Sequence, residues 1–174
     1  NLMVLGGSGS SDTWGLRIMA SGTIAFRKTY TKEDGSTDSE SLQINGVNAY
    51  DGKWHHLAFA YDGKTKTGTL YYDYSSKSSK TFSYDMEYVD GSLLEIGAFS
   101  KANYGRWCGW VDEVRISDTV LGTNDFLRPV LKKKATEASS PDTVFFASFD
   151  NACFFGSLNT PYDINESAGT NSYV

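Results

Sequence analysis

Short segments in which apolar and polar residues alternate recur along most of this chain, and this pattern constrains the fold more than any other feature. In residues 14–20, Trp14, Leu16 and Ile18 fall on one side of an extended strand, because side chains two residues apart share a face. Polar turns that contain glycine separate the segments, and no segment sustains a 3.6-residue helical repeat. The pattern therefore predicts antiparallel sheets without intervening helices, which means a sandwich or a barrel.

The same pattern predicts the remaining elements. Trp14, Trp54 and Trp110 alternate with other apolar residues and are expected in the core. The 174 residues are enough for one domain with a sizeable core, since 40% of them are hydrophobic. Strands are expected over 2–5, 14–20, 23–29, 41–44, 54–61, 67–73, 93–99, 107–116 and 143–149, a charged hairpin loop over 32–38, a polar loop over 75–80 and a short helical turn over 118–128.

Charge and hydropathy exclude two classes of partner. The chain has 16 Lys and Arg against 21 Asp and Glu, a net charge of -5, whereas a nucleic-acid-binding surface needs a basic patch. No apolar run is long enough to span a membrane. The two cysteines, Cys108 and Cys153, permit one disulfide or two free thiols. Nucleic acid and a membrane span are therefore not expected.

Several motifs in this order and spacing resemble a known family. Residues 51–58 read Asp-Gly-Lys-Trp-His-His-Leu-Ala, and residues 109–117 read Gly-Trp-Val-Asp-Glu-Val-Arg-Ile-Ser. Together with 61–63, 68–73 and 94–97, these motifs resemble the laminin G-like jelly-roll domains of the concanavalin A-like lectin/glucanase family. The resemblance implies an all-β, antiparallel, two-sheet jelly-roll sandwich.

The chain departs from this family at its beginning. The family's opening strands have no counterpart before Asn1, yet residues 143–149 look like such an opening strand at the other end. Because the first strand of this fold lies beside the last, we expect 143–149 to pair antiparallel with 107–116. The predicted organisation is a domain over 1–128, a linker over 129–142, and, in 143–174, a strand that completes the sandwich or starts a next repeat, followed by a polar tail.

No catalytic constellation stands out. Glycoside hydrolysis needs two carboxylates that face each other across the bond, and related glucanases carry them as Glu-x-Asp-x-x-Glu on one strand. The nearest run, residues 85–90, does not fit that spacing and is expected to be a solvated acidic hairpin. His55 and His56 are neighbours on a predicted strand and so point to opposite faces, where they cannot hold one metal ion together. We expect them to pack or to form hydrogen bonds.

The resemblance implies a structural calcium ion where the last strand meets the first. The family's aspartate in the last strand matches Asp112, and an aspartate of the opening strand matches Asp150. Calcium prefers oxygen ligands from carboxylates, carbonyls and water. The alternative is that Asp112 caps backbone groups or pairs with a base such as Arg115.

Ligand contacts are expected on loops, because recognition sites lie on loops over a rigid scaffold. Aromatic faces combined with polar groups hold sugars. The candidate contacts, on the loop 101–106 and on the charged hairpin, are Asn103, Tyr104, Arg106, Tyr30 and Lys32.

The function implied by the resemblance is a non-catalytic extracellular recognition module within a larger secreted or cell-surface protein. Its partner is a glycan or an extracellular protein. One alternative is a glycoside hydrolase or lyase on the same fold, which requires paired carboxylates on the concave sheet. Another alternative is a structural or adhesion repeat without a ligand site, and fold alone does not decide among the three.

Overall fold

A computed structural model describes residues 3–6, 12–88, 91–97, 107–126, 143–147 and 154–156, and every regular element in them is a strand. The chain divides into two compact units. The larger comprises Asn1–Val111 and Val120–Phe126, and the smaller comprises Asp112–Thr119 and Leu127–Val174. No helix in the described part of the chain has the length and hydropathy needed to cross a lipid bilayer.

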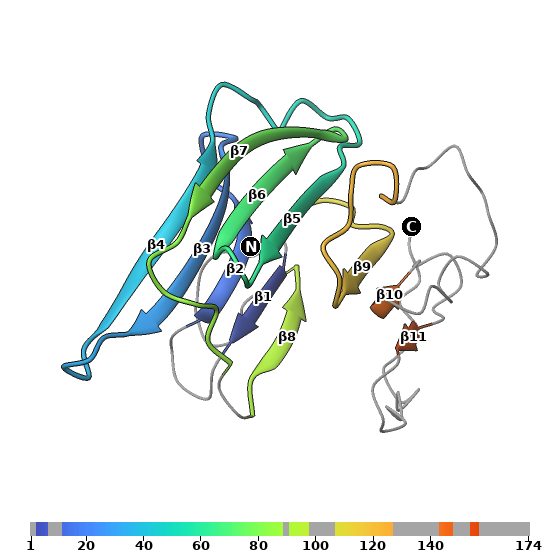
Figure 1. Cartoon of the computed structure of the whole chain (residues 1–174). Helices are drawn as coiled ribbons and strands as arrows, with labels where there is room; N and C mark the ends of the chain where they lie inside the picture. The colour runs from blue at the N-terminus through green and yellow to red at the C-terminus, as the bar shows by residue number, and fades with distance from the viewer. Residues whose placement is uncertain are drawn as a thin grey trace. The chain divides into compact units, whose positions relative to one another are not determined.

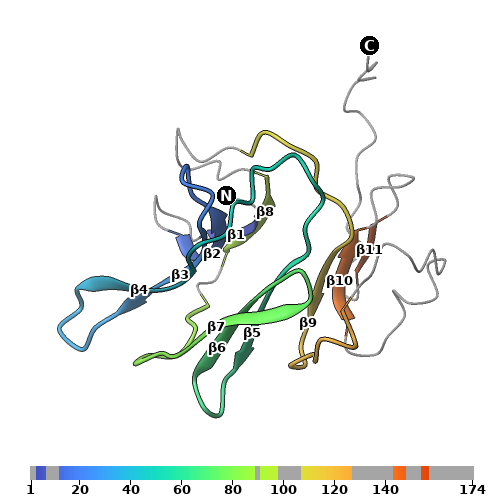
Figure 2. The same ribbon diagram turned by 90° about the horizontal axis from the view of Figure 1, so that it is seen from above.

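The larger unit is a sandwich of two antiparallel sheets, as the sequence predicted, and Figure 2 shows them as separate layers. One sheet has the strand order β4-β3-β2-β1-β8 and the other the order β5-β6-β7 (Figure 1). The strands of the first sheet are β1 (Met3–Gly6), β2 (Asp12–Ile18), β3 (Ile24–Thr31), β4 (Thr37–Ile44) and β8 (Leu93–Ile96), and those of the second are β5 (Leu57–Asp62), β6 (Thr67–Tyr72) and β7 (Ser75–Thr81).

The hydrophobic core lies between these two sheets. Phe26 of β3 stacks on Phe59 of β5 with ring centroids 3.5 Å apart, and Phe82 meets Phe26 edge-on at 6.2 Å. Gly68 of β6 makes this packing possible, since a Cβ atom there would lie 2.5 Å from the Phe82 ring. The buried residues that form this core are Leu16, Ile24, Phe26, Leu42, Ile44, Leu70 and Phe82.

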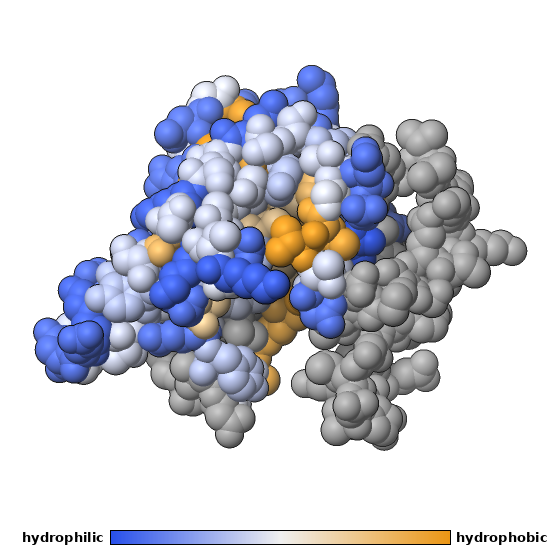
Figure 3. Space-filling view, in the orientation of Figure 1, coloured by the Kyte–Doolittle hydropathy of each residue, from blue (hydrophilic) through white to orange (hydrophobic). Residues whose placement is uncertain are grey.

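The β3–β4 hairpin projects from the first sheet and is longer than the sequence predicted. Its tip, at the lower left of Figure 1, is hydrophilic in Figure 3. Asp34 closes the turn by accepting hydrogen bonds from the amide (2.9 Å) and hydroxyl (2.6 Å) of Ser36. The charged loop expected around Asp34-Gly35 is therefore present, and the strand after it begins at Thr37 rather than at Ser41.

The smaller unit contains a sheet in the order β11-β10-β9, formed by β9 (Val114–Ser117), β10 (Thr143–Ala147) and β11 (Phe154–Gly156). Strand β10 pairs antiparallel with β9, and Phe146 lies opposite Arg115. The predicted antiparallel pairing of the late strand with the family's last strand is thus confirmed. The last strand itself is shorter than expected, because residues 107–113 form no strand.

The prediction of a polar loop over 75–80 is wrong, because this segment forms strand β7. Its residues are all Ser, Lys or Thr, so no apolar alternation marks it in the sequence. Its strand state comes from pairing with β6, helped by hydroxyl contacts between Thr69 and Ser79 at 3.1 Å and between Thr67 and Thr81 at 3.3 Å. At an edge such a strand has little apolar surface to bury, so alternation is not required.

The prediction of a short helix over 118–128 is also wrong for the part that the structure describes, residues 118–126. The chain there forms a turn in which the Asp125 amide donates to the Gly122 carbonyl (3.0 Å) and the Asp125 carboxylate accepts from the Gly122 amide (3.2 Å). A local bond between a side chain and the backbone competes with helix formation, and so short a helix is marginal without packing.

Two of the three tryptophans predicted in the core are exposed. Trp14 packs against the core as expected, but Trp54 is 66% exposed and Trp110 is 79% exposed. Both stand outside the strands that the sequence assigned to them, since β5 begins at Leu57 and β9 begins at Val114. The rule of alternating faces therefore does not apply to either residue.

Candidate functional site

His55 bridges two turns of the larger unit. Its Nε2 lies 2.9 Å from a carboxylate oxygen of Asp51, and its Nδ1 lies 3.0 Å from a carboxylate oxygen of Asp73. Two carboxylates accept hydrogen bonds from both ring nitrogens only when the ring is doubly protonated. Burial acts to lower the pKa of His55, but the bonds and charges of the two aspartates outweigh it and raise the pKa. The bond from His55 lowers the pKa of Asp51 to about 2.

The β6–β7 turn next to this histidine adopts an unusual backbone. Asp73 and Tyr74 have φ values of 48° and 63°, as in the two-residue turns that normally use glycine or asparagine. Asp73 forms two hydrogen bonds with the backbone of His56. The Asp73 carboxylate accepts from the His56 amide (3.1 Å), and the Asp73 amide donates to the His56 carbonyl (2.9 Å). The Tyr74 ring stacks on His56 at 4.4 Å.

The paired histidines therefore hold a strained turn. This confirms the prediction that they pack or form hydrogen bonds. No motif indicated that Asp73 is their shared partner. Both nitrogens of His55 already contact carboxylates, and the His56 ring lies between Tyr74 and Phe126. The arrangement fits structural support better than proton transfer.

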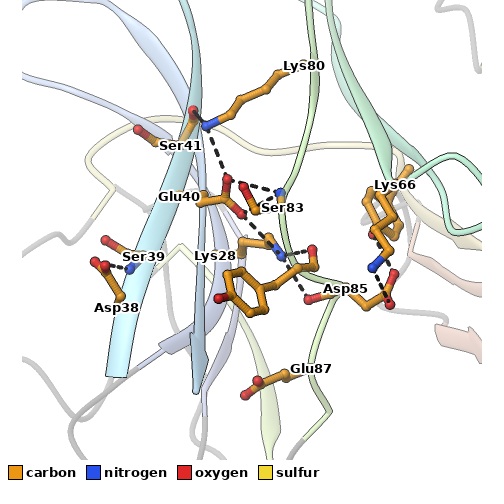
Figure 4. A network of polar contacts seen from close by, with 12 residues as sticks. Lys28, Asp38, Ser39, Glu40, Ser41, Lys66, Lys80, Ser83, Asp85 and Glu87 are labelled. Carbon is orange, nitrogen blue, oxygen red and sulfur yellow. Dashed lines mark hydrogen bonds and ion pairs between the residues drawn. The ribbon is translucent and has the colours of Figure 1, made fainter. Parts of the chain in front are cut away.

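A second polar network surrounds Lys28, whose side chain points into the sandwich from β3 (Figure 4). The ammonium group is fully buried and donates to the carbonyls of Tyr84 and Asp85, the latter at 2.8 Å. A carboxylate oxygen of Glu40 lies 3.7 Å away. Desolvation is the largest influence on the pKa of Lys28 and lowers it, against the opposing charges of Glu40 and Asp85.

Glu40 extends this network to the segment that follows β7. Its two carboxylate oxygens accept from the Ser83 amide at 3.2 and 3.1 Å, and one of them lies 3.6 Å from Lys80. Burial acts to raise the pKa of Glu40, but these bonds and charges outweigh it and the pKa is lowered. The network thus fastens the chain after β7 to the opposite sheet, and each charged side chain named in it has a partner among the described residues.

The acidic run that was weighed as a catalytic candidate is likewise engaged. Asp85 accepts from the Tyr61 hydroxyl at 3.2 Å and pairs with Lys66 at 3.2 Å. Glu87 accepts from the Thr31 amide at 2.8 Å. The two carboxylates have different partners on different strands, so the described part of this run anchors neighbouring strands.

The two candidate contacts on the charged hairpin are placed in different surroundings. Tyr30 is buried and stacks on Tyr84 with ring centroids 4.1 Å apart. Burial, together with the charges of Asp38 and Glu40, raises the pKa of Tyr30. Lys32 is partly exposed and forms an ion pair with Asp38 at 2.7 Å. Of the two, only the Lys32 side chain offers accessible surface to a ligand.

The other candidate contacts and the second calcium ligand lie outside the described residues; these are Asn103, Tyr104, Arg106 and Asp150. Asp112 is described and exposed, and its carboxylate accepts from the Glu113 amide at 2.9 Å, in agreement with the capping alternative. Among the described residues, no three His, Cys, Asp or Glu side chains gather as metal ligands. Calcium therefore remains a prediction. Cys108 is exposed, and Cys153 lies outside the described residues.

An aromatic cluster that the sequence analysis missed occupies one end of the larger unit. Tyr50, in the connection between β4 and β5, stacks on Trp107 with ring centroids 6.1 Å apart and planes 22° from parallel. The Trp107 indole donates to the Trp110 carbonyl at 3.3 Å, and the Trp107 amide donates to the Gly97 carbonyl at 2.7 Å. The available signal was the spacing of three between the tryptophans, which cannot place both on one strand face.

Comparison of the sequence with known proteins shows the family to which this chain belongs. Residues 1–125 match the family model described as the concanavalin A-like lectin/glucanases superfamily, of laminin G type. Over 87 residues the chain is 26% identical to BEACH domain-containing protein A2 of Arabidopsis thaliana, a match that covers 47% of this chain and 2% of that protein. The chain thus spans a very small part of this relative. No solved structure matches significantly. With its two-sheet sandwich and most of its length matched, the chain belongs to the concanavalin A-like lectin/glucanase superfamily as a laminin G-like domain.

Proposed function

We propose that this domain is a non-catalytic recognition module that binds a glycan or a protein, as part of a larger secreted or cell-surface protein. The observation that carries the proposal is the exposure of two loop tryptophans, Trp54 at 66% and Trp110 at 79%. Tryptophan is highly buried on average, and exposed tryptophans are enriched at the centres of binding surfaces. Loops on a rigid sandwich are the usual place for such surfaces.

The alternative of a hydrolase has less support. The family description names both lectins and glucanases, so the family alone does not separate them. Two carboxylates must face a shared substrate in a glycosidase, whereas Asp85 and Glu87 face Lys66 and the Thr31 amide, respectively. The described acidic residues therefore favour recognition over cleavage.

The proposal also includes a structural calcium ion held by Asp112 and Asp150 and ligand contacts from Asn103, Tyr104 and Arg106. The exposed carboxylate of Asp112 supports the first part, since one of its oxygens has a single amide partner and calcium collects several such oxygens. The ion would supply charge and rigidity to strand ends and take no part in a reaction.

A glycan array tests the proposal directly. The 174-residue chain is applied in calcium and again in chelator, while a parallel sample is incubated with the bound polysaccharides and assayed for new reducing ends. We expect binding without release of reducing ends, and weaker binding in chelator. Release of reducing ends would establish the hydrolase instead. Absence of binding in both buffers would remove the glycan branch and favour a protein partner or an adhesion repeat.

A further inference from the structure

Three connections of the larger unit meet at the aromatic cluster. They are the turn between β2 and β3, the connection between β4 and β5, and residues 107–111. The Tyr50 hydroxyl donates to the Ile18 carbonyl at 3.3 Å, and the Ala49 amide donates to the Gly22 carbonyl at 3.4 Å. Together with the stacking of Tyr50 on Trp107, these contacts fix the cluster on the end of the sandwich. The rings of Tyr50 and Trp107 are therefore held in place before any ligand arrives, which lowers the entropy cost of binding.

The backbone beside Trp107 is shaped to fit the indole. A Cβ atom on Gly109 would lie 2.9 Å from two carbons of the Trp107 ring, so the chain passes directly against that ring. The loop then presents Trp110, whose carbonyl accepts from the Trp107 indole and whose own side chain is 79% exposed. Tyr50 is 49% exposed. One ring of the cluster is thus supported on the protein while two offer surface to solvent.

The three described segments that meet at this cluster contain no formally charged residue. Residues 19–23, 45–50 and 107–111 contain no Asp, Glu, Lys, Arg or His. The nearest charges along the β4–β5 connection, Asp51 and Lys53, pair with each other at 3.2 Å. Asn48 is exposed, and its carbonyl oxygen accepts from the Tyr50 amide at 2.9 Å, which leaves its NH2 group as a donor beside the aromatic rings.

The size of the surface fits a small ligand. Large aromatic side chains bury about 150–250 Å² each, so the exposed fractions of Tyr50 and Trp110 together offer on the order of 300 Å². A stable protein interface takes about 800 Å² from each partner. An uncharged sugar suits a surface that offers aromatic faces and an amide donor on segments without charged residues.

We infer that Tyr50, Trp107 and Trp110, with the amide of Asn48, form a binding surface for a neutral oligosaccharide. The inference rests on the proposed recognition function and names its site and its class of ligand. The sugar lies against the exposed rings through its C–H faces, and its hydroxyls meet the amide of Asn48.

Titration of the whole chain with defined sugars tests this inference. The probes are cello-, xylo- and manno-oligosaccharides as neutral ligands and oligogalacturonate as an acidic one, followed by calorimetry. Tyr50→Ala and Trp110→Ala should each weaken binding of the neutral probe about tenfold or more, as expected for the loss of an aromatic contact. Tyr50→Phe keeps the ring but loses the hydroxyl bond to the Ile18 carbonyl, so it should weaken binding less than Tyr50→Ala does. Thermal melts of each variant show whether it remains folded.

Tyr88→Ala is the matched control, because Tyr88 is also a strongly exposed aromatic residue, at 71%, but lies between β7 and β8 and makes no ring contact with Tyr50 or Trp107 within the described residues. It should change the affinity less than twofold. Wild-type binding that survives both Tyr50→Ala and Trp110→Ala would overturn this site and leave the recognition function standing. Binding of the acidic probe alone would overturn the neutral class, and a wild-type chain that binds no sugar would remove the glycan branch of the function itself.

Discussion

Replacement of Lys28 by methionine tests how the segment after β7 is held. The buried ammonium group bonds to two backbone carbonyls and faces Glu40. Methionine fills much of the same apolar space but leaves those acceptors without their donor. Net hydrogen bonds to a charged group contribute about 1.5–3 kcal/mol each, and loss of one partner of a buried ion pair costs about 3–5 kcal/mol.

We expect Lys28→Met to lower the free energy of unfolding by about 3 kcal/mol, near the lower end of that range, because Glu40 keeps its bonds to the Ser83 amide and its contact with Lys80. For a chain of this length the melting temperature should fall by roughly 6–12 °C. Urea unfolding followed by tryptophan fluorescence, with melting curves as a second probe, measures both quantities.

Lys80→Met is the control for this experiment. Lys80 lies at a similar distance from Glu40, 3.6 Å, but its side chain is 37% exposed. Exposed ion pairs contribute about 0–1 kcal/mol, so this variant should remain close to the wild type. Equal effects of the two substitutions would refute the reasoning, because burial of Lys28 would then have no bearing on stability.

Three further predictions follow from the same geometry. Because the pKa of His55 is raised in the folded protein, protonated His55 contributes to the free energy of unfolding below pH 6.5, its ordinary pKa, and this contribution is lost as the pH rises through the pKa of the folded state. His55→Gln should therefore flatten this part of a plot of the urea midpoint against pH. Gly68→Ala should destabilise by about 1–3 kcal/mol through overpacking, whereas Gly63→Ala, where the nearest atom to the new Cβ is 3.9 Å away, should not. Calcium should raise the melting temperature of the wild type over that in EDTA but not that of Asp112→Asn, and equal midpoints in the wild type would contradict a calcium site.

Period-two alternation was sufficient to predict most strands of the sandwich but not the polar groups inside it. Alternation in the predicted strand 23–29 puts Ile24 and Phe26 on one face, and both are buried in β3. The same alternation places Lys28 on that face, and its burial depends on carbonyls 56 and 57 residues further along the chain. A pattern within one strand carries no information about acceptors supplied by a distant segment.

The aromatic cluster escaped prediction for a related reason. Trp110 alternates with other apolar residues in a predicted strand, so its side chain was expected in the core. In the structure the strand begins only at Val114, and the position of Trp110 is set by a bond from the Trp107 indole and by the stacking of that indole on Tyr50. The contact with Tyr50, more than 50 residues earlier in the chain, becomes visible only once the sheets are assembled.

Strand β7 has a consequence for how this domain behaves at high concentration. It pairs with β6 on one side and lies at the margin of the described sheet, where unpaired backbone groups invite a strand from another molecule and hence aggregation. Its sequence, Ser-Ser-Lys-Ser-Ser-Lys-Thr, opposes that event, because a second copy of the same strand would bring lysines close together and bury hydroxyls with little apolar gain. The absence of hydrophobic alternation that hid this strand from sequence analysis thus also disfavours pairing of its edge with a second copy of the strand.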